Sequence, residues 1–304
     1  MQAIVFEEFG GPEVLQLKDV EQPQPGPGQI RASVRAAGVN PADWKIRKGW
    51  MAQVVPTEFP AVPGSEFSGV VDAVGGGVIG LSVGDEVLGW SIDGAYAQYT
   101  LATVVVPKPA GLSWDVAAAL PVAGETARRV LDDLAVKEGE TVLVHGAAGS
   151  VGSMAVQLAA ARGATVIGTA SPANHDYVRL LGATPVTYGD GLVGRVRAAA
   201  PQGVDAVFDT AGKGALPDSI TLRGGTADRV ITIADPTAAE HGVPFSSGGS
   251  TPEDKRAGLA EQARQAADGT LRVLVAQTYP LAEGANAQSA SESGHTRGKL
   301  IIKP

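Results

Sequence analysis

A strand that runs directly into a glycine-rich turn and then into a helix constrains this chain more than any other feature. Residues 140–152 read ETVLVHGAAGSVG, an apolar segment followed by small residues, and a helical pattern covers residues 151–162. A β-rich segment at residues 164–169 completes a βαβ unit of about 30 residues, the expected length. The sequence therefore predicts an α/β domain with a doubly wound parallel sheet.

The turn itself predicts a dinucleotide site. Ala147, Gly149 and Gly152 have little or no side chain, so the backbone can turn tightly and a pyrophosphate can approach. Ser150, Val151 and Gly152 open the next helix, where unpaired N–H groups and the helix dipole favour negative charge. We interpret Ala147 as the first position of the usual three-glycine fingerprint. The alternative is a glycine-rich turn that binds nothing.

Charge and hydropathy exclude several function classes. The formal net charge is -8 and no basic run occurs, which argues against a nucleic-acid partner, because phosphate contacts need clustered Lys and Arg. No apolar stretch approaches about 20 residues, and no charged-then-apolar leader opens the chain, so we expect neither a membrane partner nor secretion. A cytoplasmic location is the default expectation.

Cysteine is absent, which removes disulfides and any thiolate-ligated zinc. The four histidines form no short-spaced ligand pair with another histidine or a carboxylate. We therefore expect no metal.

The pattern of the chain changes twice. Before Trp114, short β-rich runs separated by Gly and Pro clusters predict a barrel-like β domain. Helix and strand then alternate, as in a parallel sheet. After an amphipathic helix predicted at 251–267, strands at 271–277 and 299–302 are expected to complete the barrel. The other predicted strands are 3–6, 30–37, 66–74, 86–88 and 95–106, then 141–145, 165–169, 185–188, 206–209 and 230–233.

Several motifs in a fixed order carry a resemblance over nearly the whole chain. They are NPADWK at 40–45, FPAVPGSEFSGVV at 59–71, VGDEV at 83–87, GAYA at 94–97, AGETA at 123–127 and GHTRGK at 294–299. The chain resembles the zinc-independent quinone oxidoreductases of the medium-chain dehydrogenase/reductase family. The resemblance implies a GroES-like β-barrel catalytic domain at 1–117 and 269–304, a Rossmann NADP-binding domain at 118–268, and a cleft between them for the nicotinamide. Ser65 stands where related zinc enzymes carry a histidine.

The end of the second Rossmann strand points to NADPH. NAD enzymes usually place a carboxylate there, about 20 residues past the glycine turn, on the ribose hydroxyls. Residues 168–171 read GTAS, with no acid to repel a 2′-phosphate. Ser171 can donate a hydrogen bond, His175 or Arg179 can supply positive charge, and Tyr188 matches a tyrosine that contacts the 2′-phosphate in related reductases. Alternatively, Ser171 caps the helix and Arg179 is solvated.

The reaction of this family requires a hydrogen-bond donor to the substrate rather than a catalytic base. The cofactor supplies hydride, and negative charge develops on the carbonyl oxygen of the substrate, so a hydrogen-bond donor there lowers the barrier. Asn40 and Lys45, in the family's cleft motif, are the candidates. The alternatives are a turn before Pro41 and a surface lysine.

Further cofactor contacts are implied by position. Thr126 lies in the turn that faces the nicotinamide in relatives, and Asp209 and Ile233 end the fourth and fifth strands, where Rossmann ligands sit. Lys299 matches the family's tail motif and is expected to reach the cofactor, unless it is a surface lysine. His145 is expected to be packed rather than catalytic. Trp44, Trp50 and Trp90 are expected to line an apolar pocket or the barrel core.

The predicted function is NADPH-dependent reduction of a small molecule, a quinone or an α,β-unsaturated carbonyl compound. A catalytically silent cofactor-binding protein and a metal-free alcohol dehydrogenase remain as alternatives. Relatives dimerise through edge strands of the Rossmann sheet, so we expect a homodimer with contacts near residues 228–233 and 243–247.

Overall fold

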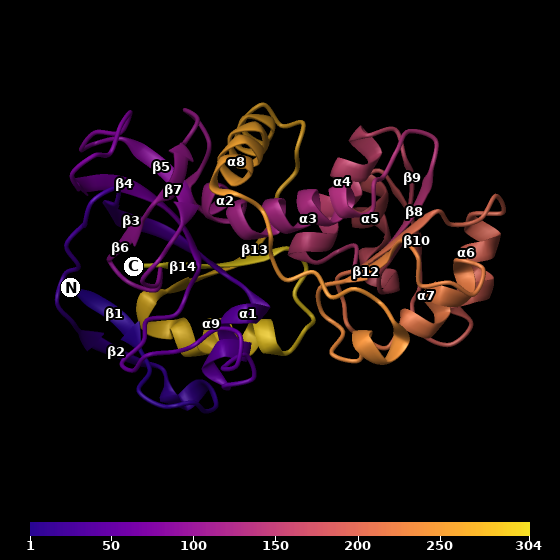
Figure 1. The fold of residues 1–304 in the computed structure, drawn as a ribbon, viewed down its shortest axis with the longest axis horizontal. Helices are drawn as coiled ribbons and strands as arrows, with labels where there is room; N and C mark the ends of the chain where they lie inside the picture. Colours follow the sequence, from indigo (N-terminus) through magenta and orange to yellow (C-terminus); the bar gives the residue numbers. More distant parts are fainter. The chain divides into compact units, whose positions relative to one another are not determined.

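The computed structural model describes all 304 residues and divides them into two compact units. Unit 1 comprises Met1–Val122 and Thr251–Pro304, and unit 2 comprises Ala123–Ser250. The two-domain order is as expected, but the boundaries differ from the predicted 117/118 and 268/269. Helix α8 (Pro252–Ala267), predicted to belong to the parallel-sheet domain, packs on strand β7 of unit 1. Figure 1 shows the course of the chain.

Unit 1 is built on a seven-stranded sheet in the order β13-β14-β3-β4-β5-β7, with β6 paired to β3. Neighbours are antiparallel except β13 and β14, which run parallel. Two further strands, β1 and β2, pair with each other. The strands are β1 (Gln2–Val5), β2 (Gln16–Asp19), β3 (Ile30–Val39), β4 (Glu66–Val74), β5 (Glu86–Trp90), β6 (Tyr99–Ala102), β7 (Val104–Pro107), β13 (Val275–Pro280) and β14 (Lys299–Lys303).

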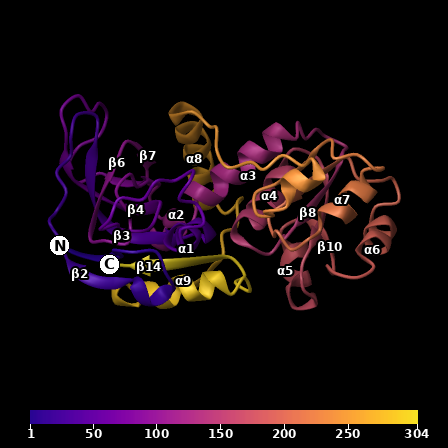
Figure 2. The ribbon, with the colours of Figure 1, turned by 60° about the horizontal axis from the view of Figure 1, so that its bottom comes forward.

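The two ends of the chain meet within this sheet. β14 pairs through Leu300, Ile301 and Ile302 with the end of β3, so the last strand lies inside the sheet rather than at its edge. Leu300 and Ile302 join Ile30, Phe67 and other alternating residues in one apolar core. Figure 2 shows the C-terminal segments in yellow beside the N-terminal ones in indigo. The predicted completion of the β domain by C-terminal strands is confirmed.

One of these strands is displaced from its predicted position. The prediction places it at 271–277, whereas β13 spans Val275–Pro280. Leu271 N–H donates to the carbonyl of Gln265 at 2.9 Å, so the turn that ends α8 takes up the first residues of the predicted strand.

Short helices complete unit 1. They are α1 (Pro41–Arg47), α2 (Trp114–Ala118), α8 and α9 (Gly284–Glu292), with 3-10 turns at Pro12–Val14 and Leu281–Glu283. Helix α3 (Pro121–Asp133) starts at the unit boundary and continues into unit 2. None of the helices in the structure has the length and hydropathy needed to cross a bilayer.

Unit 2 is a five-stranded parallel sheet in the order β10-β9-β8-β11-β12. β8 is buried along its whole length, as is typical of a central strand covered on both faces. The strands are β8 (Thr141–His145), β9 (Thr165–Thr169), β10 (Ala183–Val186), β11 (Ala206–Asp209) and β12 (Val230–Thr232). The doubly wound sheet is as predicted, with β10 starting two residues before its predicted start at 185.

Helices cover both faces of this sheet. Right-handed crossovers put α4 and α5 on one face and α6 and α7, which contact each other, on the other. The bounds are α4 (Ser150–Ala161), α5 (His175–Leu180), α6 (Leu192–Ala199) and α7 (Leu216–Leu222), with 3-10 turns at Pro172–Asn174 and Ala238–His241. After β12, Phe245 forms an isolated parallel bridge with Thr232, which extends the sheet by one residue pair.

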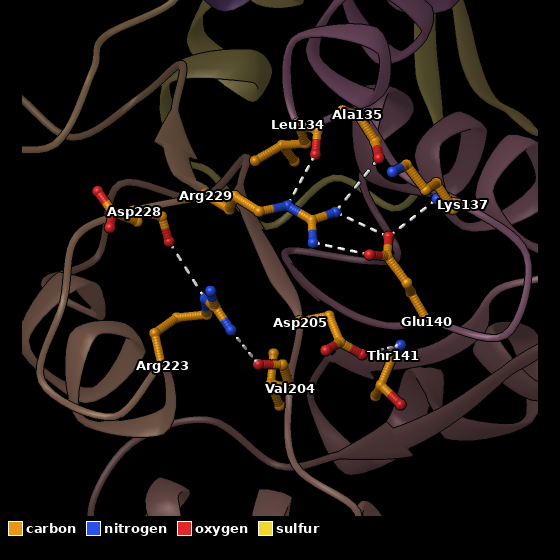
Figure 3. Close-up of polar contacts among 10 residues, drawn as sticks. All are labelled: Leu134, Ala135, Lys137, Glu140, Thr141, Val204, Asp205, Arg223, Asp228 and Arg229. Atoms are coloured by element: carbon orange, nitrogen blue, oxygen red, sulfur yellow. Dashed lines mark hydrogen bonds and ion pairs between the residues drawn. The ribbon is translucent and has the colours of Figure 1, made fainter.

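An arginine ties together the amino ends of the strands in unit 2 (Figure 3). Arg229, just before β12, forms two hydrogen bonds of 2.8 and 2.7 Å with the carboxylate of Glu140, just before β8. Its Nε also donates to the carbonyl of Leu134 at 2.9 Å. The hydrogen bonds from Arg229 lower the pKa of Glu140 to about 2. This network stabilises the amino ends of the strands, at the opposite end of the sheet from the glycine turn.

Candidate functional site

The strand–turn–helix element of unit 2 forms a cradle for a phosphate. β8 ends at His145, and the chain turns at Gly146, whose φ of +73° lies in the left-handed region that favours glycine. A Cβ atom on Gly152 would lie 2.1 Å from the carbonyl oxygen of Gly146, so helix α4 can start this close to the turn only with glycine. The turn residue is therefore Gly146 rather than Ala147, whose N–H donates to the carbonyl of Thr169 at 3.0 Å.

The first turn of α4 offers free donors. The N–H of Ser153 donates to the carbonyl of Gly149 at 2.9 Å, which is the first bond of the helix. The N–H groups of Ser150, Val151 and Gly152 precede it and have no acceptor within the helix. Gly149 has no side chain to cap them, and a Cβ there would meet a single backbone atom, at 3.4 Å. This open cradle of amides fits the pyrophosphate of a dinucleotide.

His145, the residue before the turn, is held by contacts of both ring nitrogens. Its Nδ1 lies 3.3 Å from Thr169 Oγ1 and its Nε2 lies 3.0 Å from Ser219 Oγ. Thr169 Oγ1 also accepts the N–H of Gly146 at 3.1 Å. Burial lowers the pKa of His145, which keeps the ring neutral. The prediction of a packed histidine is confirmed.

The residues predicted to recognise the 2′-phosphate gather at the carboxyl ends of β9 and β10. Ser171 follows β9, and its Oγ lies 3.2 Å from Asn174 Nδ2; it makes no side-chain bond that caps the helix. His175 Nε2 lies 3.5 Å from Thr187 Oγ1, which places it beside the residues after β10. Tyr188 is 57% exposed.

Arg179 differs from the rest of this group. It lies on α5, is solvent-exposed, and pairs with Asp176 at 2.6 Å. This arrangement matches the alternative interpretation, in which Arg179 is a surface residue. Its contact with the cofactor stays a prediction.

Three other predicted cofactor residues lie in unit 2. Thr126 on α3 is buried, and its Oγ1 donates to Glu125 Oε2 at 3.3 Å. Asp209 is also buried: its Oδ2 accepts from Thr232 Oγ1 at 2.7 Å, and its Oδ1 accepts two backbone N–H groups of the following loop, at 3.0 and 3.1 Å. Ile233 is half-buried, and its N–H donates to the carbonyl of Asp209 at 3.0 Å. The Asp209 carboxylate thus fixes the loop that follows β11. Contacts of Thr126, Asp209 and Ile233 with a cofactor stay a prediction.

Unit 1 holds a buried polar cluster around the start of α1. Asn40 precedes the helix; its Nδ2 donates to Glu66 Oε1 at 2.8 Å, and its Oδ1 accepts from Lys299 Nζ at 2.6 Å. Lys299 and Glu66 also form an ion pair. Glu66 Oε2 accepts the N–H of Val122 at 2.7 Å. Four segments of the chain are thereby joined by charged and amide groups that solvent hardly reaches.

Asp43 extends this cluster. Its Oδ2 accepts the backbone N–H of Asn40 and the hydroxyl of Tyr96, each at 2.8 Å. Burial raises the pKa of Asp43 to about 6, against the lowering effect of these hydrogen bonds. Burial and the neighbouring Asp43 raise the pKa of Tyr96 as well. The N-cap and the N3 side chain of α1 are therefore fixed to the body of the unit.

These contacts bear on two predicted roles. Both ends of the Asn40 carboxamide are engaged inside the cluster, and the Lys299 ammonium, predicted to reach the cofactor, lies between Asn40 and Glu66. Lys299 is not the surface lysine of the alternative interpretation, since it is 2% exposed. Direct contacts of either residue with substrate or cofactor stay predictions.

Lys45 occupies a different side of α1. It is half-buried, and burial lowers its pKa. Its Nζ lies 5.6 Å from the centre of the Trp44 ring, and Trp44 meets Trp50 edge to face at 5.5 Å. Trp50 is 67% exposed. Trp90, the third predicted aromatic, instead faces Lys255 of α8 at 5.5 Å.

No group of three His, Cys, Asp or Glu side chains in the structure is arranged to hold a metal ion. Ser65, at the position of the zinc-ligand histidine of related enzymes, precedes β4.

Sequence reasoning missed Gly146, Asp43 and Glu66. Gly146 completes a glycine spacing of three with Gly149 and Gly152, which was visible in the sequence. Asp43 stands three residues after Asn40, the spacing of a capping box. Glu66 is an acid at the start of an apolar strand, but its partner Lys299 lies at the far end of the chain and no local pattern relates the two.

Comparisons with known proteins agree with this architecture. A family model described as "Alcohol dehydrogenase GroES-like domain" matches residues 26–110, and one described as "Zinc-binding dehydrogenase" matches residues 181–302. The quinone oxidoreductase of Mus musculus is 32% identical, with 99% of this chain and 97% of the mouse protein covered.

Solved structures give the same picture. The quinone oxidoreductase from Coxiella burnetii is 33% identical with a TM-score of 0.88, covering 100% of this chain and 99% of the other. The Escherichia coli quinone oxidoreductase complexed with NADPH is 27% identical with a TM-score of 0.87, and both chains are covered completely. The predicted fold class, a GroES-like domain with a Rossmann sheet, is confirmed.

Proposed function

The chain belongs to the zinc-independent quinone oxidoreductases of the medium-chain dehydrogenase/reductase family, and from this premise we propose that it is an NADPH-dependent oxidoreductase. Its substrates are quinones or the conjugated C=C bond of α,β-unsaturated carbonyl compounds, and no zinc takes part. The observation that carries the proposal is the cradle of open amides at Ser150, Val151 and Gly152, next to a strand end without a carboxylate.

The preference for NADPH is supported by the end of β9. Residues 170–174 read ASPAN and contain no acid to repel a 2′-phosphate. Ser171, His175 and Tyr188 lie at this edge with polar groups that can donate to a phosphate. The Escherichia coli and mycobacterial structures among the relatives were both solved with NADPH.

When bound, NADPH supplies a hydride to an electron-poor carbon. The protein must then stabilise the negative charge on the carbonyl oxygen of the substrate. Lys45 is the proposed donor, because its lowered pKa brings the ammonium closer to giving up a proton. Asn40 is the second proposed catalytic residue. Its carboxamide is held in a fixed position by hydrogen bonds to Glu66 and Lys299.

The test is turnover with a panel of acceptors. We expect the protein to oxidise NADPH with 1,4-benzoquinone, an alkenal or an enoyl thioester, and to bind NADPH more tightly than NADH. Tight NADPH binding without turnover of any of the three would overturn the enzymatic proposal and favour a silent cofactor-binding protein. Oxidation of simple alcohols alone would favour a metal-free alcohol dehydrogenase.

We further propose that the protein is cytoplasmic and forms a homodimer. Support for the dimer comes from β12, which is the last strand of the parallel sheet and is paired on its outer side through one bridge, between Thr232 and Phe245. Light scattering should give a mass of twice 30.8 kDa. A monomer at micromolar concentration would contradict this.

A further inference from the structure

A single arginine holds the loop that follows β10. Arg195 of α6 donates from its guanidinium to the backbone carbonyls of four consecutive residues. Its Nε donates to Thr187 at 2.8 Å, its Nη1 to Asp190 at 2.7 Å, and its Nη2 to Tyr188 at 3.2 Å and Gly189 at 2.9 Å. A guanidinium has five N–H donors. Since four of them are used, Arg195 has little capacity left for another ligand.

The loop lies where a parallel sheet of this order binds the ribose of a dinucleotide. β10 runs parallel to β9, with Val186 paired to Thr169, and the N–H of Ala170 donates to the carbonyl of Val186 at 3.0 Å. Residues after β9 and residues after β10 therefore leave the sheet side by side. In a doubly wound sheet, the residue after the second strand faces the ribose hydroxyls. Residues 187–190 thus form the outer side of that site.

The charges near this site are almost all neutralised or absent. Residues 170–174 contain no Lys or Arg. Arg179 forms an ion pair with Asp176 at 2.6 Å, and the N–H groups of Arg195 donate to backbone carbonyl oxygens. Tyr188, by contrast, is 57% exposed, and Arg195 binds its backbone carbonyl rather than its side chain. Beside Ser171 and His175, the Tyr188 hydroxyl is the third donor proposed for the 2′-phosphate, and its contribution depends on where the loop holds it.

We propose that Arg195 is a positioning residue for cofactor selectivity. By fixing the backbone of residues 187–190, it holds the Tyr188 hydroxyl toward the 2′-phosphate of NADPH without touching the phosphate itself. This inference rests on the proposed NADPH dependence. An arginine near the ribose would more simply be assigned a direct ion pair with the 2′-phosphate, and the positioning role proposed for Arg195 differs from that.

Replacing Arg195 with lysine distinguishes positioning of the loop from direct binding of the phosphate. Lysine keeps the positive charge but concentrates it on one nitrogen, so it cannot bridge four carbonyls that need a planar fork of donors. If Arg195 positions the loop, R195K and R195Q lose selectivity alike. If Arg195 binds the phosphate, R195K retains most of it.

The experiment is a titration of NADPH and NADH against R195K, R195Q, Y188F and the double variant R195Q/Y188F. R197Q is the matched control, because Arg197 lies on the same helix and is exposed, whereas the hydrogen bonds to the loop carbonyls come from Arg195. We expect R195K, R195Q and Y188F each to weaken NADPH binding about tenfold, the loss of one hydrogen bond to a charged group, and to change NADH binding less than about twofold. R197Q should match the wild type for both cofactors.

The double variant provides the second readout. If both residues act through the Tyr188 hydroxyl, R195Q/Y188F binds NADPH no more weakly than either single variant. Additive losses, or R195K at wild-type affinity, would overturn the positioning role. If R195Q does not fold, R195K and Y188F decide the same question. Equal affinity of the wild type for NADPH and NADH would instead overturn the proposed cofactor, whereas a wild-type preference for NADPH that survives in R195K and R195Q would overturn only the role of Arg195.

Discussion

Lys299 and Glu66 form an ion pair from which solvent is almost completely excluded, with side-chain exposures of 2% and 0%. The two residues lie on β14 and β4, on either side of β3 in the sheet of unit 1. Asn40 bridges them by accepting from the lysine and donating to the glutamate.

Removing one member of this pair should destabilise the protein strongly. K299M leaves the Glu66 carboxylate buried without its counter-charge, and E66Q leaves the Lys299 ammonium in the same condition. Each change is expected to lower the free energy of unfolding by about 3–5 kcal/mol in urea titrations. The double variant E66Q/K299M should lose less than the sum, because it leaves no buried unpaired charge.

The same variants test the predicted cofactor contact of Lys299. If Lys299 acts only within unit 1, folded K299M binds NADPH as the wild type does. A loss of NADPH affinity in K299M, measured under conditions where the variant is fully folded, would support the predicted cofactor contact.

Asp43 should make stability fall as the pH rises. The folded state raises its pKa from 3.8 to about 6, so between these values the folded protein binds more protons than the unfolded chain. The favourable contribution of the protonated carboxyl is complete below pH 3.8 and is lost as the pH rises through about 6. A shift of this size corresponds to about 3 kcal/mol.

Urea unfolding of the wild type and D43N between pH 4 and 8 checks this. D43N should flatten the decline, because an amide does not ionise. An equal slope in both proteins would show that another group causes the decline.

Lys45 should affect turnover more than binding. K45Q removes the proposed donor, and we expect kcat for 1,4-benzoquinone to fall about a hundredfold, the lower end for a lost general acid. The affinity for NADPH should change little. Because the pKa of Lys45 lies below its usual value, wild-type activity should decline on the alkaline side earlier than an ordinary lysine allows, and K45Q should lack this decline. An exposed lysine of unit 2, in K137Q, is the control. Unchanged kcat in K45Q would exclude the proposed role.

Gly152 should tolerate no side chain. In G152A the new Cβ would lie 2.1 Å from the carbonyl oxygen of Gly146, so the turn and the start of α4 must separate. NADPH binding, measured by fluorescence titration, should weaken at least about a hundredfold, since the amides move away from the pyrophosphate by more than a hydrogen bond tolerates. The matched change G194A in α6, where a Cβ meets nothing within 4 Å, should leave binding intact. Wild-type affinity in G152A would contradict the cradle.

Sequence reasoning worked best where a pattern is local. The glycine turn and the strands around it predicted the parallel sheet of unit 2, because consecutive parallel strands need a helix between them. Helix α1 was not recognised: its seven residues are too few for a periodic apolar pattern. The signals that were present were an Asn at the N-cap, a Pro at the first position and an Asp at the third.

Long-range pairing explains the remaining differences. The cluster of Asn40, Glu66 and Lys299 depends on the register between β14, β3 and β4, which no short motif encodes. Helix α8 has the amphipathic pattern predicted for it, yet the pattern alone does not say which sheet its apolar face will cover. The loop held by Arg195 is likewise a matter of three-dimensional arrangement.

The interior place of β14 also sets an order of assembly during synthesis. Ala123–Ser250 is synthesised before β13 and β14, so unit 2 can fold while residues 37–39 of β3 still lack their partner strand β14. Until Lys299 arrives, Glu66 has no counter-charge and the start of α1 has no anchor. Unit 1 therefore depends on a strand that is synthesised after all of unit 2, and a chain that stops before β14 would keep a folded nucleotide-binding unit while exposing an incomplete sheet to chaperones and proteases.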